Sequence, residues 1–226
     1  MEMEITLPGE VPVMTLPNTV FFPQALLPLH IFEPRYRHML RDALASNRLF
    51  AVAALNQHPA DPAAFEPAHP IAAVGIIRAC QKNENGTSNL LLQGLCRVEI
   101  TKILRDEPYR RIQIRALASE AGATSEDNAT LRREVVRLVQ LKQKLTSAGP
   151  RELTTFLKNV EDPDAFADIA AFNLCDDPAL KQHLLETLDV NRRLRLFGDH
   201  LRREIETVKL EQRLQGRRPD ERIPEN

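Results

Sequence analysis

The chain contains six histidines and three cysteines, the side chains best suited to bind a metal or attack a substrate. The histidines are scattered, and only His30 and His38 lie near each other. A pair across a strand–helix junction is a weak metal signal, so we interpret both as surface or hydrogen-bonded histidines. Cys96 lies in an alternating strand pattern, where burial would keep its thiol inert. We therefore expect neither a metal site nor a catalytic cysteine.

Motifs that bind nucleotides or build hydrolytic sites do not occur in this sequence. None of the eight glycines begins GxxxxGK followed by Ser or Thr, and there is no GxGxxG. These patterns place backbone N–H groups around phosphates. Neither HExxH nor GxSxG is found. The sequence therefore favours a protein that is not an enzyme and needs no cofactor.

The least expected charges lie in the stretch EPRYRHMLRD, from Glu33 to Asp42. Arg35 and Arg37 fall in the first turn of an expected helix, where free backbone N–H groups disfavour cations. Arg37 and Arg41 are four residues apart on one face and repel each other weakly if solvated. One interpretation is a solvated face. The other is a structural charge cluster, in which carboxylates or strand carbonyls hold one or more of the arginines and fix the helix against the β-rich part. Glu33 and Asp42 are the nearby candidates.

Composition and charge narrow the class of protein. Of 226 residues, 43% are hydrophobic and 27% charged, as in soluble globular proteins. Residues 1–120 carry 12 basic and 12 acidic side chains, which makes nucleic-acid binding an unfavoured expectation. No apolar run approaches the roughly 20 residues of a membrane span, and the acidic start is unlike a signal peptide. With three dispersed cysteines, we expect a cytoplasmic protein that does not bind membranes.

The first half of the chain has short runs typical of β-strands. Asn85-Gly86 lies between two such runs and predicts a tight hairpin, because Asn and Gly both accept positive φ. Pro34 followed by an apolar stripe predicts one short helix to about Ala45. The expected strands are residues 11–16, 19–22, 26–32, 49–55, 73–80, 89–95, 96–104 and 110–118.

After a polar break at residues 119–128 the pattern becomes helical. Asp162 followed by Pro163 is a typical helix start, and Asp176 is expected to cap the next helix. The tail GRRPDERIPEN has no periodicity and is expected to be frayed. The expected helices are residues 127–147, 151–160, 163–173, 177–187 and 189–214.

Three motifs resemble the amino-terminal domain of the Lon protease family, especially its stand-alone bacterial versions. The first is PVMTLPNTVFFPQALLPLHIFEPRYRHML. The second is a Val-Gly strand, a hairpin and a Leu-x-Gly-x-x-Arg strand within residues 73–100. The third is a Leu-Leu-Glu-x-x-Asp-Val-x-x-Arg-Leu helix pair within residues 181–201. The resemblance covers about residues 11–210, and the three motifs occur in the family's order.

The resemblance implies an α+β fold. Residues 1–118 would form a PUA-like β pseudobarrel with one short helix, and residues 119–226 a helical bundle with a long C-terminal helix. In the protease this region helps to recognise protein substrates and assemble the hexamer, which implies a non-catalytic module that binds polypeptides. The chain ends at Asn226 without the phosphate-binding loop or the Ser-Lys dyad region, so we expect neither activity from it.

The expected partner is an unfolded or exposed apolar polypeptide segment, or a partner protein. Candidate contacts are large apolar side chains before and within the first helix, for each of which core packing is the alternative. A free strand edge could also accept a peptide by strand addition. The candidate residues are Phe21, Phe22, Leu29, Phe32, Tyr36, Met39 and Leu40.

Other functions remain open. The chain could be an accessory or regulatory subunit that docks on a protease or another assembly through its helical part. PUA-like folds elsewhere bind RNA, although the neutral first half and the few aromatic residues count against this. A small-ligand pocket is the remaining alternative. Oligomeric state is not indicated by the sequence.

Overall fold

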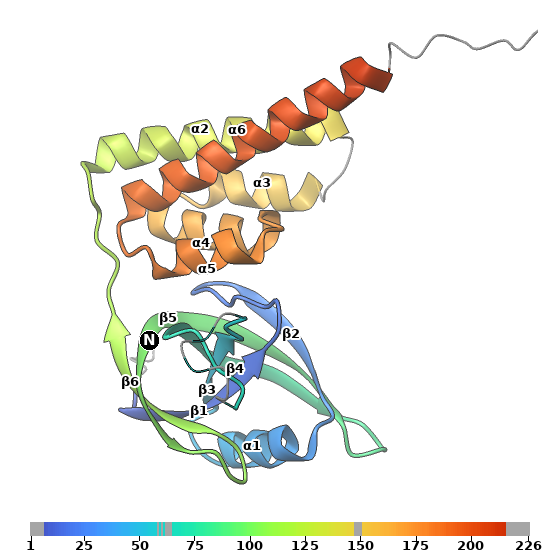
Figure 1. The fold of residues 1–226 in the computed structure, drawn as a ribbon, viewed down its shortest axis with the longest axis vertical. Helices are drawn as coiled ribbons and strands as arrows, with labels where there is room; N and C mark the ends of the chain where they lie inside the picture. Colours follow the sequence, from blue (N-terminus) through green and yellow to red (C-terminus); the bar gives the residue numbers. More distant parts are fainter. Residues whose placement is uncertain (1–6, 58, 60, 62–64, 147–150, 216–226) are drawn as a thin grey trace, which may run out of the picture.

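The computed structural model describes residues 7–57, 59, 61, 65–146 and 151–215, and its helical part is stacked on its β-rich part (Figure 1). The expected α+β class is confirmed, whereas the tail expected to be frayed lies outside the described residues. The strands are β1 (Glu10–Leu16), β2 (Leu26–Ile31), β3 (Leu49–Ala54), β4 (Ile71–Lys82), β5 (Ser88–Arg105) and β6 (Arg111–Leu117). The helices are α1 (Pro34–Leu44), α2 (Ser125–Thr146), α3 (Arg151–Asn159), α4 (Pro163–Leu174), α5 (Pro178–Glu186) and α6 (Val190–Gln215).

Two strand predictions are wrong. Residues 19–22 form no strand, because their large apolar side chains fill space between the sheet and the helices. Residues 89–95 and 96–104 belong to one long strand, β5, whose bulges let it bend without ending.

Two local details also differ from expectation. The helix α5 is capped by Asp177 rather than Asp176, and Asp177 Oδ1 accepts from the backbone N of Ala179 (2.9 Å). In the hairpin only Gly86 has positive φ (78°), and its N–H donates to the carbonyl of Asn83 (3.0 Å). A single left-handed glycine is sufficient for a turn of this length.

The six strands form one mixed sheet in the order β2-β5-β4-β3-β1-β6. Because β5 also pairs with β6, five strands close into a ring, and β2 is added outside it on β5. The β1–β3 pair is parallel, and the other pairs are antiparallel. This is the pseudobarrel that the resemblance implies.

Two hydrophobic clusters stabilise the structure. The smaller cluster draws on all five ring strands and not on β2, which places it inside the ring. The larger cluster runs from α1 across the sheet into the helical bundle, so the two parts share one core. The predicted division into domains at residue 118 therefore stays a prediction. The buried residues of the smaller cluster are Val11, Val13, Leu49, Ala51, Ala53, Ala72, Val74, Val98, Ile112 and Ile114.

The segment between β1 and β2 is fixed to β5 at Gly94. The carbonyl of Gly94 accepts from the N–H of Gln24 (3.0 Å), and its own N–H donates to Ala25 (2.9 Å). A Cβ at this position would lie 2.0 Å from the carbonyl oxygen of Phe22, so only glycine allows this approach. The segment then reaches the bundle, where the rings of Phe21 and Phe172 meet edge to face at 6.4 Å.

A buried ion network connects the ring to the bundle. Arg97 of β5, Asp168 of α4 and Arg193 of α6 are each at most 3% exposed. Arg97 donates from Nη1 to Asp168 Oδ2 (2.8 Å), from Nη2 to Oδ1, and from Nε to the carbonyl of Leu185 (3.0 Å). Arg193 donates from Nη1 to Asp168 Oδ1 and from Nη2 to Asp164 Oδ1 (2.8 Å). One carboxylate thus holds two guanidiniums from different parts of the molecule.

Both arginines belong to motifs on which the resemblance rests. Arg97 ends the Leu-x-Gly-x-x-Arg motif, and Arg193 is the arginine of the helix-pair motif. The segment before α2 pairs with the α5–α6 connection nearby, since the N–H of Glu120 donates to Leu188 (3.0 Å) and the N–H of Val190 donates to Glu120 (2.8 Å). Two distant parts of the sequence therefore meet at one junction.

None of the described helices is both long enough and apolar enough to cross a membrane.

We expect Asp168→Asn to lower the free energy of unfolding by about 3–5 kcal/mol, because it leaves the buried guanidinium of Arg97 without a carboxylate and that of Arg193 with Asp164 alone. Urea denaturation measures this. The matched control is Glu99→Gln, which removes the carboxylate that pairs with exposed Arg115 and should cost less than about 1 kcal/mol. Equal effects of the two changes would contradict the role of the network.

Candidate functional site

Most of the predicted contact residues lie in the core, which corrects the expectation that they touch a partner. Two of them belong to the segment before β2 that fills space between the sheet and the bundle. Three form the apolar stripe of α1 and pack on the sheet. The buried residues are Phe21, Phe22, Tyr36, Met39 and Leu40.

The remaining candidates lie on β2 and just after it. Leu29 is half-buried, and Phe32 is 61% exposed. Side chains alternate along a strand, so Leu26 (52% exposed), Pro28 and His30 share the outward face of β2. His30 connects to Phe32 by ring stacking, with centroids 6.1 Å apart. We call Leu26, Pro28, His30 and Phe32 the β2 strip.

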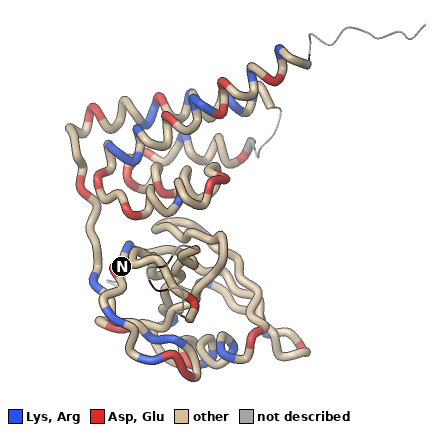
Figure 2. The backbone as a smooth tube through the Cα atoms, in the orientation of Figure 1, with Lys and Arg blue, Asp and Glu red and all other residues tan. Residues whose placement is uncertain are grey.

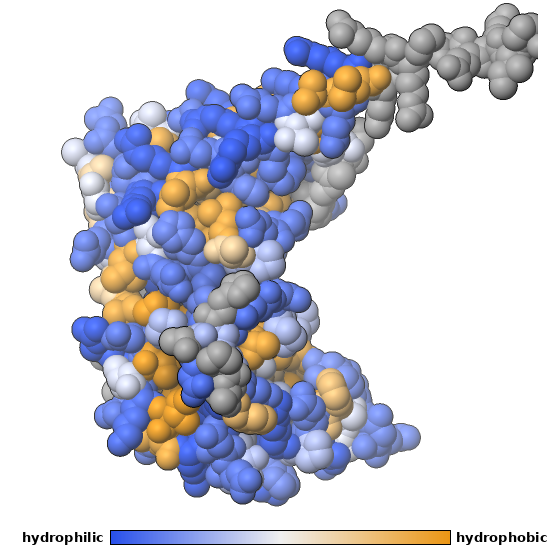
Figure 3. Space-filling view, viewed as in Figure 1, coloured by the Kyte–Doolittle hydropathy of each residue, from blue (hydrophilic) through white to orange (hydrophobic). Residues whose placement is uncertain are grey.

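The apolar surface of the β2 strip continues onto the neighbouring strands. Pro28 lies beside Leu91 of β5, and Leu91 lies beside Ala79 of β4. His30 Nδ1 lies 2.7 Å from Oδ1 of Asn89, which satisfies one polar group at the end of the strip. Figure 3 shows apolar side chains where β2 runs, on the side where the outline is hollowed between the two parts. A surface of this kind is typical of contact with another protein.

The backbone edge of β2 is less suited to binding than its outward face. Among the described strands β2 pairs only with β5, so its other edge is open. Pro28 in the middle of this strand lacks an N–H, and prolines in strands place the missing donor on the unpaired side. Such an edge resists the addition of another strand. The side chains of the β2 strip are therefore the better candidate.

A groove of about 460 Å³ lies where α5 meets the β-rich part. In it, His69 Nδ1 is 3.6 Å from Glu186 Oε1. Gln182 donates to Glu186 Oε1 (2.8 Å) and to the carbonyl of Ile71 (3.1 Å), while its own Oε1 is buried without a hydrogen-bond partner among the described residues. The groove combines amides, two histidines and two carboxylates, and no nucleophile is paired with a base in it.

The predicted charge cluster is only partly formed. Arg35 donates from Nε to Glu33 Oε2 (2.9 Å) and binds both oxygens of Glu66 (2.8 and 2.6 Å). Its guanidinium also lies 4.5 Å from the ring centroid of Tyr36. The carboxylate of Glu66 raises the pKa of Arg35 further above its ordinary value. Arg35 therefore connects α1 to the segment before β4, through a carboxylate that the sequence did not point to.

The other members of the cluster lie apart. Asp42 accepts a hydrogen bond from the hydroxyl of Tyr109 (2.9 Å), which lowers the pKa of Asp42, and a longer one from Arg41 Nε (3.3 Å). Arg37 is exposed and forms no ion pair with any residue that the structure describes. Of the three arginines, Arg35 is thus held by Glu33 and Glu66, Arg41 has only the longer contact to Asp42, and Arg37 has no ion pair among the described residues.

The described residues do not assemble a metal site, and two of the three thiols are disfavoured as nucleophiles. No group of three or more His, Cys, Asp and Glu side chains among them could hold a metal ion. His30 lies on the outward face of β2, whereas His38 lies on the exposed side of α1. Burial raises the pKa of the Cys96 and Cys175 thiols, which disfavours the nucleophilic thiolate.

We expect Arg35→Ala to lower the free energy of unfolding by about 1–2 kcal/mol, since it removes a bidentate ion pair and a cation–π contact. Arg37→Ala is the matched control on the same helix and should change it by less than about 0.5 kcal/mol. Thermal unfolding of both variants measures the difference. A larger effect at Arg37 would mean that this arginine, and not Arg35, fixes α1.

Comparison with known proteins agrees with this geometry. The family model described as the ATP-dependent protease La (LON) substrate-binding domain matches residues 10–203. The Lon protease of Dictyoglomus thermophilum is 29% identical over 210 residues, which are 93% of this chain and 26% of that protein. The Lon protease of Heliobacterium modesticaldum is 27% identical over 208 residues, 92% of this chain and 26% of that protein. The chain thus spans about a quarter of the length of these relatives.

Solved structures show the same fold. The N-terminal domain of the Mycobacterium avium complex Lon protease superposes with a TM-score of 0.67 at 22% identity, covering 85% of this chain and 97% of that one. A Lon N-terminal domain protein from Xanthomonas campestris gives a TM-score of 0.57 at 18% identity, with 82% and 95% covered. The family match extends from β1 into α6 and includes both motif arginines. The chain belongs to the LON substrate-binding domain family.

Proposed function

We propose that this chain binds exposed apolar segments of other proteins through the β2 strip, and that its role is recognition and not catalysis. The observation that carries the proposal is the exposure of Leu26 on β2 and of Phe32 just after it, while Leu27 and Ile31 on the other face of the strand are buried. Membership in a family described as substrate-binding supports it. Because its relatives of greater length are Lon proteases, the proposal includes recognition of proteins destined for proteolysis.

The chemistry of the β2 strip suits bound polypeptides of many different sequences. Fully burying a large apolar side chain contributes about 1.5–3 kcal/mol, and this term does not depend on the direction of the bound chain. The strip offers few polar groups that would demand a particular partner, since His30 is already close to Asn89. We therefore expect weak binding to a wide range of unfolded polypeptides.

A second candidate is docking through the far end of α6. Leu210 and Leu214 are one turn apart there and are 58% and 59% exposed. The end of α6 extends beyond α4 and α5 (Figure 1). Basic and acidic residues alternate along α6, which favours a protein partner over nucleic acid (Figure 2). This surface would suit an accessory subunit.

We expect Leu26→Ser combined with Phe32→Ser to weaken binding of a reduced, alkylated and permanently unfolded protein by at least about tenfold, or about 1.4 kcal/mol. The physical reason is the loss of apolar area at the contact. Fluorescence anisotropy with the labelled unfolded protein measures the affinity.

The matched control is Phe156→Ser, because Phe156 is 54% exposed and lies on α3 in the helical part. It should leave the affinity unchanged. If Leu210→Ser with Leu214→Ser abolishes binding while the strip variant does not, docking through α6 replaces the proposal. Equal affinities for all variants would also overturn it.

A further inference from the structure

We infer that the groove between α1 and the β4–β5 hairpin is a second binding site, which takes acidic segments of polypeptides. The inference rests on the proposed function, since it names a class of segment. The groove has a volume of about 730 Å³, within the range of about 300–1,000 Å³ typical of ligand sites. It lies on the opposite face of the hairpin from Phe32, because Ser88 and Cys80 line it while Asn89 lies beside His30.

The charged side chains that line the groove are basic. Arg37 and Arg41 come from α1, and Lys82 comes from β4. His38 adds a side chain that becomes cationic when protonated. No acidic residue is among the described residues that line the groove. Figure 2 shows basic residues along α1, at the end of the molecule away from the bundle.

Arg37 is the central cation of this groove. Its guanidinium lies over the hairpin turn, where a Cβ on Gly86 would be 2.5 Å from Nη2. The absence of a side chain at Gly86, which has φ of 78°, leaves room for it there. Unlike Arg35, Arg37 donates to no described residue, so its N–H groups remain available for a carboxylate. Guanidinium binds carboxylates in a bidentate manner.

The two carboxylates that flank the arginines of α1 in the chain already have partners. Glu33 is held by Arg35 at 2.9 Å, and Asp42 accepts from Tyr109 at 2.9 Å. Asp42 contacts Arg41 only at 3.3 Å, and the side chain of Arg41 is mostly exposed. The groove therefore keeps an excess of positive charge that a bound segment can complement.

The groove walls favour polypeptide over nucleic acid. Pro34, Leu40, Leu44 and Cys80 add apolar surface between the cations. No Phe, Tyr or Trp side chain is among the described lining residues, whereas single-stranded nucleic acids stack their bases mainly on such rings. A segment in which acidic and aliphatic side chains alternate matches both features.

The test uses the full chain and two fluorescein-labelled peptides. In one, Glu alternates with Leu; in the other, Gln replaces Glu. We expect the Glu peptide to bind at least about tenfold more tightly at low salt and to weaken as salt screens the charges. Equal affinities for the two peptides, or tighter binding of a single-stranded RNA than of the Glu peptide, would overturn the inference.

Two double variants, each of which removes two positive charges, test whether the Glu peptide binds in the groove. Arg37→Gln with Lys82→Gln should reduce affinity for the Glu peptide at least about tenfold. Lys102→Gln with Arg203→Gln removes the same charge from exposed positions elsewhere and should leave the affinity unchanged. All four residues are exposed, so melting temperatures should match. An equal loss in both variants would assign binding to net charge and reject the groove.

A readout independent of mutation comes from Cys80, which lines the groove and is partly exposed. Burial raises the pKa of Cys96 and Cys175, so both should react slowly with iodoacetamide. Saturating Glu peptide should slow the modification of Cys80. Full reactivity of Cys80 with the peptide bound would place the peptide elsewhere and overturn the inference.

Different results would overturn the proposed role of the β2 strip and the inference about the groove. If the unfolded protein binds in a way that depends on the β2 strip and the Glu peptide does not bind, only the groove inference is overturned. If the Glu peptide binds at the groove and the strip variant has no effect on the unfolded protein, the proposed role of the strip is overturned and the groove inference stands.

Discussion

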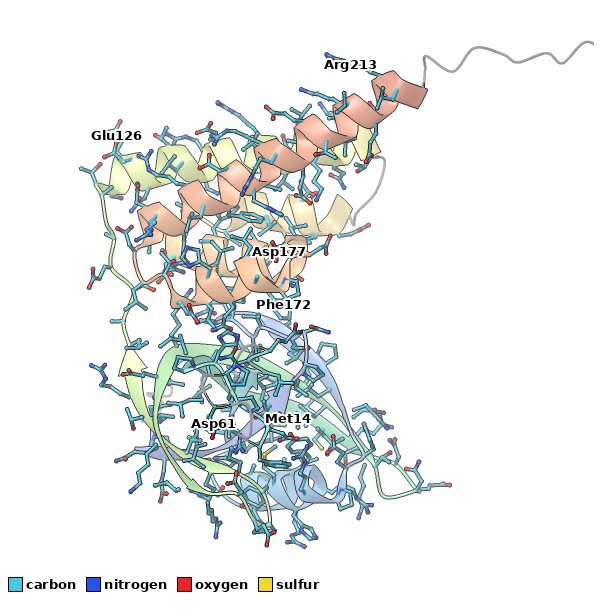
Figure 4. All side chains as sticks on the ribbon, in the orientation of Figure 1. Met14, Asp61, Glu126, Phe172, Asp177 and Arg213 are labelled. Atoms are coloured by element: carbon cyan, nitrogen blue, oxygen red, sulfur yellow. The ribbon has the colours of Figure 1, made fainter. Side chains whose placement is uncertain are left out.

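The placement of the helical bundle on the sheet depends on the carboxylate of Asp168, buried between Arg97 and Arg193. A buried charge is costly unless partners surround it, so this junction tolerates few other arrangements. Arg97 comes from the middle of the long strand β5, and Arg193 from the first turns of α6. The network therefore fixes the orientation of the bundle relative to the sheet. The shared hydrophobic core stabilises the same arrangement, but apolar contacts are non-directional and do not set the orientation. Figure 4 shows Phe172 at this junction, where Phe21 meets it.

That arrangement buries many of the apolar side chains near the start of the chain. Phe21 and Phe22 fill the junction, and the stripe of α1 covers the sheet. In this part of the chain, the outward face of β2 and the groove beside α1 remain accessible to a partner. The two surfaces differ in chemistry: one is apolar, and the other combines cations with aliphatic walls. A recognition module with both could hold segments that differ in composition, since hydrophobic and charge-assisted contacts select different residues.

Much of the fold could be predicted because its signals are local. The apolar stripe after Pro34, the cap at Asp162 and the hairpin at Asn85-Gly86 each depend on neighbours within a few residues. The buried ion network could not be predicted in this way. Asp168 lies in an apolar helical stretch with no local pattern to indicate two arginine partners, and the distances along the chain to Arg97 and Arg193 are 71 and 25 residues. The sequence indicated Arg97 and Arg193 only through the motifs that resemble the Lon family, because both arginines belong to those motifs.

The sequence by itself determined the order of elements, the α+β class and the family, since periodicity, turn residues and motif order can be read along the chain. Only the tertiary structure decided which apolar side chains are exposed. Alternation along β2 predicts two faces but does not say which face is covered. Phe32 is exposed because none of the described residues covers it beside this added strand. In the same way, Arg35 is held and Arg37 is open because Glu66, 31 residues from Arg35 in the chain, approaches one side of α1. Long-range proximity of this kind has no local signature.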